Sequence, residues 1–315
     1  MCTRLWIITA CAFFGLLFSC EKPAKLTEIR LAAGGTTGTY YSYAKALAGI
    51  IEERLNIPVT VIESAASVAN IALIESGAAN FAFVQNDVMT YAYNGTNLFS
   101  TEGAKKDFAV IAGLYNEVCH IVARAQTEEI GALKGERVSV GEMGSGTTLN
   151  AAQIFEVFGM SFADIKPVYL GFGDSANALA AGEISAFFCT AGSPNPAIEE
   201  LAKTVPIRIL PLGDARSRLL MTTYPYYATH RIVAGTYTGL EKTINTVAVR
   251  ATLIASTNIA ADDVYKVVKV LFESKNDPAA HPKADELSPQ AAIFSIPIPF
   301  HPGALRYYRE LGFLK

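Results

Sequence analysis

The spacing of apolar residues changes along the chain between that of helices and that of strands, and this change predicts an α/β protein. Apolar residues stand at positions 44, 47, 48, 51 and 55, which is the spacing of one buried helix face. Short apolar runs flank this helix, "IRLAA" before it and "IPVTVIES" after it, and these predict strands. The segments "SVANIALIESG" and "NFAFVQND" add a second helix and a third strand. Such a βαβαβ order predicts a parallel sheet covered by helices.

The same order of elements recurs in the middle of the chain. The segment "RVSVGEMGSGTTLNAAQIFEVFG" predicts a strand, a polar loop and a helix, and "IKPVYLG", "SANALAAG" and "ISAFFCTAGSP" follow as strand, helix and strand. Gly38 and Gly146 lie in the two loops, and Gln85 and Thr190 lie at the two strand ends. The number of residues that separates the two glycines is nearly the same as the number that separates Gln85 from Thr190. We therefore expect two α/β lobes of like design rather than one continuous sheet.

Both repeats contain a loop rich in Gly, Ser and Thr between a strand and a helix, "GGTTGTYY" and "GEMGSGTT". The first turn of a helix has unpaired N–H groups and a partial positive charge, and ligands of open α/β sheets bind beyond the carboxyl ends of the strands. One such loop is explained by ordinary helix capping. Two in equivalent places favour a cleft that holds a small carboxylate. Neither loop has the pattern of a P-loop or a dinucleotide site.

The candidate ligand-binding residues lie in these loops and at the strand ends: Gly38, Thr39, Tyr40, Tyr41, Gln85, Ser145, Gly146, Thr147, Thr148, Thr190 and Gly192. They offer hydroxyls, backbone N–H groups and aromatic faces, which suit a small organic acid. Asn86 and Ser193 are further candidates.

The sequence does not decide which charged residues contact the ligand. Asp87, Glu63 or Glu117 could meet a ligand ammonium group, although an Asp after a strand is more often a helix cap. Arginines that could bind a second carboxylate are Arg124, Arg231 and Arg250, and the sequence does not choose among them.

Composition and charge exclude several classes of function. The chain has 315 residues and a formal net charge of −3, so no basic surface indicates a nucleic-acid partner. The four histidines are scattered, and His120 is expected to be structural. No metal-ligand spacing and no nucleophile elbow occurs. We therefore expect no enzymatic activity and no cofactor, and we assign no residue to metal binding.

The N-terminus predicts export. The apolar run "LWIITACAFFGLLFSC" follows Arg4 and is typical of a signal peptide, here residues 1–19, with residues 20–28 as a linker. The ending "LFSC" is similar to a lipobox, although Phe18 is larger than usual there, and it predicts lipid attachment to Cys20. An uncleaved membrane anchor is the alternative. Cys119 and Cys189 remain in the mature chain, and we expect them to be buried and unpaired rather than bridged.

Together these motifs resemble a known family. The leader, "AAGGTTGTYYSYAKALA", "NIALIESGAANFAFVQND", "VGEMGSGTTLNAA" and "AFFCTAGSPNPAIEEL" are similar to the TAXI-type solute receptors of TRAP transporters, over nearly all of the chain after residue 28. The resemblance implies a two-lobed type II periplasmic-binding-protein fold with a ligand cleft between its lobes. It implies that residues 29–116 and 249–315 form the first lobe and residues 117–248 the second.

The resemblance also implies a function. Such receptors bind a small organic acid, for example a glutamate-like amino acid, a dicarboxylate or a 2-oxoacid, and deliver it to the membrane permease subunit of a TRAP transporter. An ABC-type or sensory binding protein for a heterocyclic or aromatic molecule is the first alternative, and an exported enzyme is the second.

Overall fold

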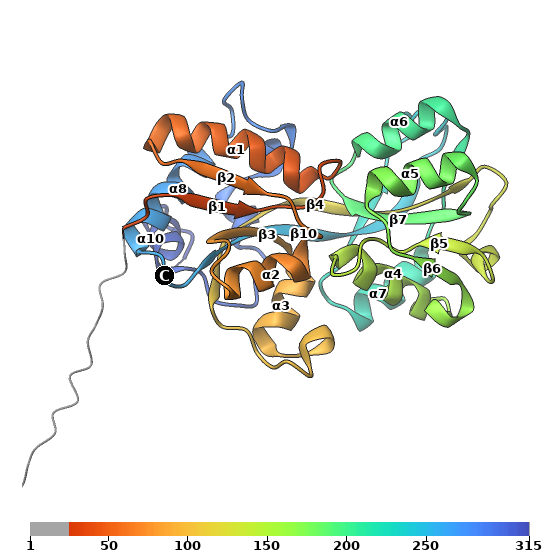
Figure 1. The fold of residues 1–315 in the computed structure, drawn as a ribbon, viewed down its shortest axis with the longest axis horizontal. Helices are drawn as coiled ribbons and strands as arrows, with labels where there is room; N and C mark the ends of the chain where they lie inside the picture. The colour runs from red at the N-terminus through yellow and green to blue at the C-terminus, as the bar shows by residue number, and fades with distance from the viewer. Residues whose placement is uncertain (1–24, 315) are drawn as a thin grey trace, which may run out of the picture.

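The computed structural model describes residues 25–314, and these form two α/β lobes that lie side by side (Figure 1). The predicted signal peptide and Cys20 lie outside the described residues. Among the described residues, no helix is long and apolar enough to cross a membrane.

The first lobe, on the left in Figure 1, contains the first βαβαβ unit and most of the C-terminal helices. Its elements are β1 (Ile29–Ala32), α1 (Thr39–Leu55), β2 (Val59–Ile62), α2 (Ser67–Glu75), β3 (Phe81–Gln85), α3 (Asn86–Asn94), α8 (Ala261–Glu273), α9 (Pro289–Ile293) and α10 (Pro302–Glu310). Strand β1 pairs in parallel with both β2 and β3, as the sequence pattern predicts.

The second lobe repeats this arrangement. Its elements are β5 (Arg137–Ser139), α4 (Gly146–Val157), β6 (Lys166–Val168), α5 (Phe172–Ala181), β7 (Ala186–Ala191), α6 (Pro196–Thr204), β8 (Ile207–Ile209), α7 (Asp214–Thr223) and β9 (Ala228–Ile232). Strand β5 pairs in parallel with both β6 and β7, so the order β6-β5-β7 matches the order β2-β1-β3 of the first lobe.

Two long strands, β4 (Phe108–Arg124) and β10 (Ile244–Ser256), run antiparallel to each other from one lobe into the other (Figure 1). Strand β10 pairs with β3 in the first lobe, and β4 pairs with β7 in the second. The prediction of separate sheets was therefore wrong in one respect, because these two strands join all the parallel strands into one hydrogen-bonded path. The register between them shifts between Arg250 and Thr252, close to the place where the lobes meet.

Strand β3 is buried on both faces. In β3, Phe81 and Phe83 pack with α1 and α8 on one face, while Ala82 and Val84 pack with α2 and α3 on the other. Burial on both faces explains why this strand has a continuous apolar sequence instead of alternating with polar residues.

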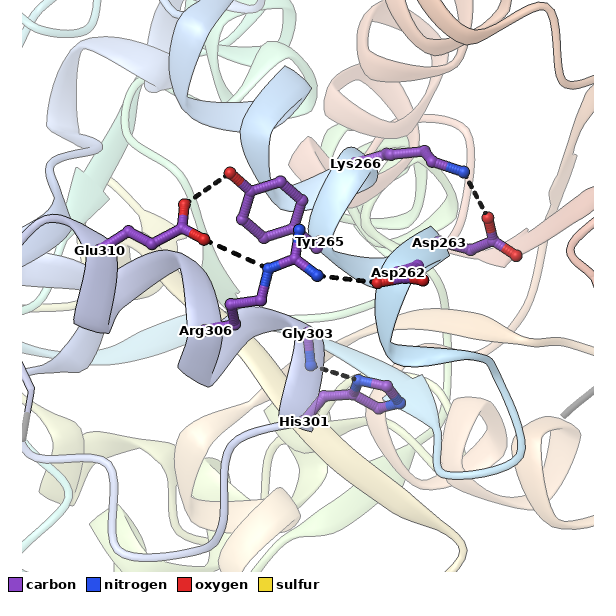
Figure 2. Close-up of polar contacts among 8 residues, drawn as sticks. All are labelled: Asp262, Asp263, Tyr265, Lys266, His301, Gly303, Arg306 and Glu310. Atoms are coloured by element: carbon purple, nitrogen blue, oxygen red, sulfur yellow. Dashed lines mark hydrogen bonds and ion pairs between the residues drawn. The ribbon is translucent and has the colours of Figure 1, made fainter. Parts of the chain in front are cut away.

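Helices α8 and α10 pack closely and fasten the C-terminal segment to the first lobe (Figure 2). Arg306 donates to Asp262 and to Glu310, and its guanidinium lies 3.8 Å from the ring centre of Tyr265. Near the start of α10, Gly303 lies against the backbone of α8, where an added Cβ would overlap the carbonyl oxygen of Ala261. This contact requires glycine because the obstructing atoms belong to a helix backbone.

We therefore expect Gly303→Ala to lower the free energy of unfolding by about 1–3 kcal/mol, since the helices must separate to admit one methyl group. The measurement is the midpoint of denaturant unfolding. Gly49→Ala is the matched control, because Gly49 is an exposed position of α1 with nothing within 4 Å of the added Cβ. That variant should be neutral or slightly stabilised. Equal midpoints for the two variants would contradict the packing argument.

Candidate functional site

A cavity of about 190 Å³ lies between the two lobes. It is smaller than the pockets that hold drug-sized molecules, about 300–1,000 Å³, and so suits a small metabolite. The cavity is lined by the loops after β1, β2, β5 and β6 and by the ends of β3 and β7. These are the carboxyl ends of all six parallel strands of the two repeats, the edge at which ligands of open α/β sheets bind.

Four helices begin at this cavity. Helices α1, α2 and α5 start at Thr39, Ser67 and Phe172, and none of the three has a side-chain cap. Helix α4 starts at Gly146, where the hydroxyl of Ser145 accepts from the backbone N–H of Thr148. The first turns of α1 and α4 approach the cavity from opposite lobes. Their backbone N–H groups and partial positive charges can therefore hold a carboxylate between them.

A buried acid lies at the inner end of the cavity. Glu117 on β4 is 3% exposed, and the hydroxyl of Tyr40 donates to its Oε2 at 2.5 Å. Burial, followed by the nearby Asp87 carboxylate, raises the pKa of Glu117 well above its ordinary value, while the hydrogen bond from Tyr40 opposes this shift. Burial favours the neutral form of this carboxyl group, which can accept from Tyr40 and donate its own proton.

The structure brings eight of the predicted ligand-binding residues together in the cavity lining. They are Gly38, Thr39, Tyr40, Gln85, Ser145, Gly146, Thr147 and Thr190. The other three lie behind the lining. Tyr41 packs against the core of the first lobe, Thr148 donates to the carbonyl of Glu142, and the N–H of Gly192 donates to the hydroxyl of Thr39.

Most of the further candidates lie outside the lining. Asn86 bonds to the backbone of Tyr226 and Arg250, and His120 is a buried structural residue bonded to the Cys189 carbonyl and the Tyr237 hydroxyl. Neither Ser193 nor any of the three arginines considered above lines the cavity. Cys119 and Cys189 are both free and buried, as expected. Among the described residues, no group of His, Cys, Asp or Glu side chains is suited to hold a metal ion.

Several lining residues are not among the sequence candidates, in particular Glu142, Phe172 and Asp174. The predicted ligand-binding residues lie after the first strand and at the end of the third strand of each repeat, and none follows the middle strand. The repeat itself contains the missing signal, because the loops after β2 and β6 occupy equivalent places and both end at the cavity. Glu63, which follows β2, is one of three acids that the sequence offers as partners of a ligand ammonium group.

Hydrogen bonds join the lobes around the cavity. The hydroxyl of Thr39 accepts from the Gly192 N–H at 3.0 Å, and the hydroxyl of Thr37 accepts from the Gly173 N–H at 3.2 Å. The N–H of Val68 donates to the carbonyl of Gly144 at 3.1 Å. These bonds describe a closed arrangement of the two lobes.

A buried polar network joins the lobes beside the cavity. Asp87 of α3 accepts from the Asn150 amide of α4 at 2.9 Å, and Asn150 also donates to the hydroxyl of Tyr227. Tyr227 donates in turn to Gln153, whose amide reaches Tyr91 of α3. Burial raises the pKa of Asp87 to about 6, because no cation in the network compensates its charge. Asp87 is thus part of the lobe interface and not of the cavity lining.

Fold and site together define a two-lobed α/β protein with a small-molecule cleft between its lobes, the architecture of periplasmic binding proteins. Residues 31–312 match the NMT1-like family, and the chain belongs to that family.

Solved structures share this fold at low sequence identity. The alkanesulfonate-binding protein SsuA from Xanthomonas axonopodis, bound to MOPS, is 16% identical, with a TM-score of 0.52, 93% of this chain covered and 81% of that one. PhnD1 from Prochlorococcus marinus, in complex with methylphosphonate, is 9% identical, with a TM-score of 0.54 and coverages of 83% and 89%. The ligand-binding component of an ABC-type import system from Staphylococcus aureus is 10% identical, with a TM-score of 0.50 and coverages of 79% and 72%. At these identities the likeness is one of fold.

The buried carboxyl of Asp87 makes stability depend on pH. Its pKa is about 6 in the folded protein, against about 3.9 for an exposed Asp, so between pH 4 and 6 the folded state retains a proton that the unfolded chain loses. This contribution is fully present below pH 4 and is lost as the pH rises through 6, a change of about 3 kcal/mol. We expect Asp87→Asn, which stays neutral, to reduce the fall in unfolding free energy between pH 4 and 6.

The measurement is denaturant unfolding at several pH values, with Asp107→Asn, at an exposed position, as the control. The control should follow the unmodified protein throughout. If the Asp87→Asn curve runs parallel to that of the unmodified protein, Asp87 is not the group that titrates.

Proposed function

We propose that this protein is an exported receptor that binds a small organic acid between its two lobes and delivers it to a membrane transporter. The observation that carries the proposal is the pair of helix N-termini, α1 and α4, that face one cavity from opposite lobes. The membership of the NMT1-like family and the fold shared with binding proteins for alkanesulfonates and methylphosphonate support it. Lipid attachment at Cys20 would keep the receptor at a membrane.

Binding and closure are coupled in this proposal. A ligand bound to one lobe gains the donors of the other lobe only when the lobes close, so it stabilises the closed state by the difference in its affinity for the two states. The lining residues Thr39 and Thr147 belong to opposite lobes. One ligand can therefore contact both of them only when the cleft is closed. Strands β4 and β10 would serve as the hinge, with the lobe boundaries near residues 116 and 248.

Thr39 tests this coupling, because it lines the cavity and its hydroxyl accepts from the Gly192 N–H of the other lobe. Thr39→Val keeps the shape of the side chain and leaves that buried N–H without an acceptor, which costs about 1–3 kcal/mol. We expect ligand affinity to fall roughly tenfold, which corresponds to about 1.4 kcal/mol, while the fold is retained.

The ligand is found first by recording the melting temperature against a panel of small carboxylic acids, since a ligand at a hundred times its Kd adds about 2.7 kcal/mol. The affinity of the best ligand is then measured by calorimetry for Thr39→Val and for Thr60→Val, at an exposed position of β2. Only the first variant should lose affinity. If no acid in the panel raises the melting temperature, the proposed function fails.

Two kinds of membrane partner remain candidates. The sequence motifs resemble TRAP receptors, whereas the same fold occurs in a ligand-binding component of an ABC-type import system. The source of energy distinguishes the two. Under the TRAP proposal, ligand uptake by cells that produce the receptor should stop when the ion gradient is collapsed and should continue when ATP is depleted with the gradient intact. The opposite pattern would identify an ABC permease as the partner.

A further inference from the structure

The charged side chains that line the cavity are all acidic. They are Glu63, Glu142 and Asp174, and no lysine or arginine is found among the described residues of the lining. Glu117 also lines the cavity, but burial favours its neutral form. A cavity built only for a dicarboxylate would be expected to supply at least one cation, because a bidentate arginine is the usual partner of a second carboxylate. The lining instead presents three carboxylates and no side-chain cation.

Three of these acids form a group at the mouth of the cavity, which we call the acidic rim: Glu63, Glu142 and Asp174. Glu63 follows β2 in the first lobe, whereas Glu142 follows β5 and Asp174 lies in the first turn of α5, both in the second lobe. Burial, and after it the charges of Glu63 and Asp174, raise the pKa of Glu142, so the three carboxylates lie within electrostatic reach of one another. An acid in the first turn of a helix stabilises that helix. This effect explains the presence of Asp174 but not that of Glu63 or Glu142.

The rim opposes closure unless a cation lies within it. Because Glu63 belongs to one lobe and the other two acids to the other, closing the cleft brings like charges together. A cation between them turns this repulsion into attraction, and it does so only in the closed state.

Gln85 provides a second, independent observation. Its side chain is 3% exposed and lines the cavity, and its Oε1 is buried without a hydrogen-bond partner. This oxygen lies over the first residue of α4, where an added Cβ on Gly146 would overlap it. An unpaired buried acceptor is costly, and a ligand that donates an N–H group removes the cost. A dicarboxylate or a 2-oxoacid has no such group.

We propose that the ligand carries a cationic nitrogen together with a single carboxylate, as monocarboxylic amino acids do. The carboxylate lies between the N-termini of α1 and α4, and the ammonium group faces the acidic rim and the Gln85 carbonyl. This inference rests on the proposed function. It narrows the ligand of the receptor to dipolar molecules and excludes dicarboxylates and 2-oxoacids.

The experiment uses the full-length protein and pairs of acids that differ only in the amino group. Alanine is compared with propionate, glutamine with 4-carbamoylbutanoate, and leucine with 4-methylpentanoate, by melting temperature and then by calorimetry. In the pair that binds best, we expect the amino acid to bind at least tenfold more tightly than its deaminated partner. Calcium and magnesium ions are tested alone, and we expect no stabilisation from them.

Variants of the acidic rim test whether its carboxylates cause the difference in affinity between an amino acid and its deaminated partner. Glu142→Gln and Glu63→Gln should each weaken binding of the amino acid severalfold and leave or improve binding of its deaminated partner, because they remove charge that attracts one and repels the other. Glu128→Gln, at an exposed position of the second lobe, is the matched control and should change neither.

The outcomes separate this inference from the proposed function. The inference of a dipolar ligand is overturned if the deaminated acids bind as tightly as the amino acids, or if the rim variants leave the ratio of the two affinities unchanged. Either result leaves the proposed receptor function standing. Stabilisation by a divalent cation without any amino acid would also overturn the inference of a dipolar ligand. If neither members of these pairs nor other carboxylic acids bind, both proposals fail together.

Discussion

The two long strands β4 and β10 are the constraint on which the rest of the structure depends. Each is part of the sheet in both lobes, so the lobes cannot slide past each other without breaking the ladder between these strands. Bending is still available where the register shifts near Arg250. A pair of shared strands therefore opposes sliding of the lobes and keeps the six parallel strand ends directed at one cavity.

The cavity combines two kinds of electrostatic feature, and under our proposal they bind different parts of one ligand. Backbone N–H groups at the starts of α1 and α4 favour an anion, whereas Glu63, Glu142 and Asp174 favour a cation. Each feature alone has an ordinary structural explanation, either in helix geometry or in surface charge. Their presence a few residues apart in the same small space, beside the unpaired Gln85 oxygen, is what indicates a dipolar ligand.

The sequence predicted the repeat, the loops and most of the strand ends, because hydrophobic spacing and glycine-rich turns are local signals. It placed Thr39 and Thr147 in candidate loops, and both line the cavity. It did not predict one continuous sheet, since the pairing of β3 with β10 joins segments far apart in the chain. Asp87 and Glu142 show that the positions of side chains are also beyond what local sequence predicts. Which of two acids after a strand faces the cleft and which faces the opposite lobe depends on tertiary packing that no local pattern contains.

The position of β10 near the end of the chain has a consequence for biogenesis. Gln85 pairs with Ala251, so the edge of β3 has no partner until most of the polypeptide is available. A chain that emerges with its N-terminus first would expose this apolar edge throughout its synthesis or export, and exposed edges invite pairing with other chains. Helper proteins that shield strand edges would therefore matter most before the last quarter of the chain arrives, and truncations near the C-terminus would damage the first lobe more than the second.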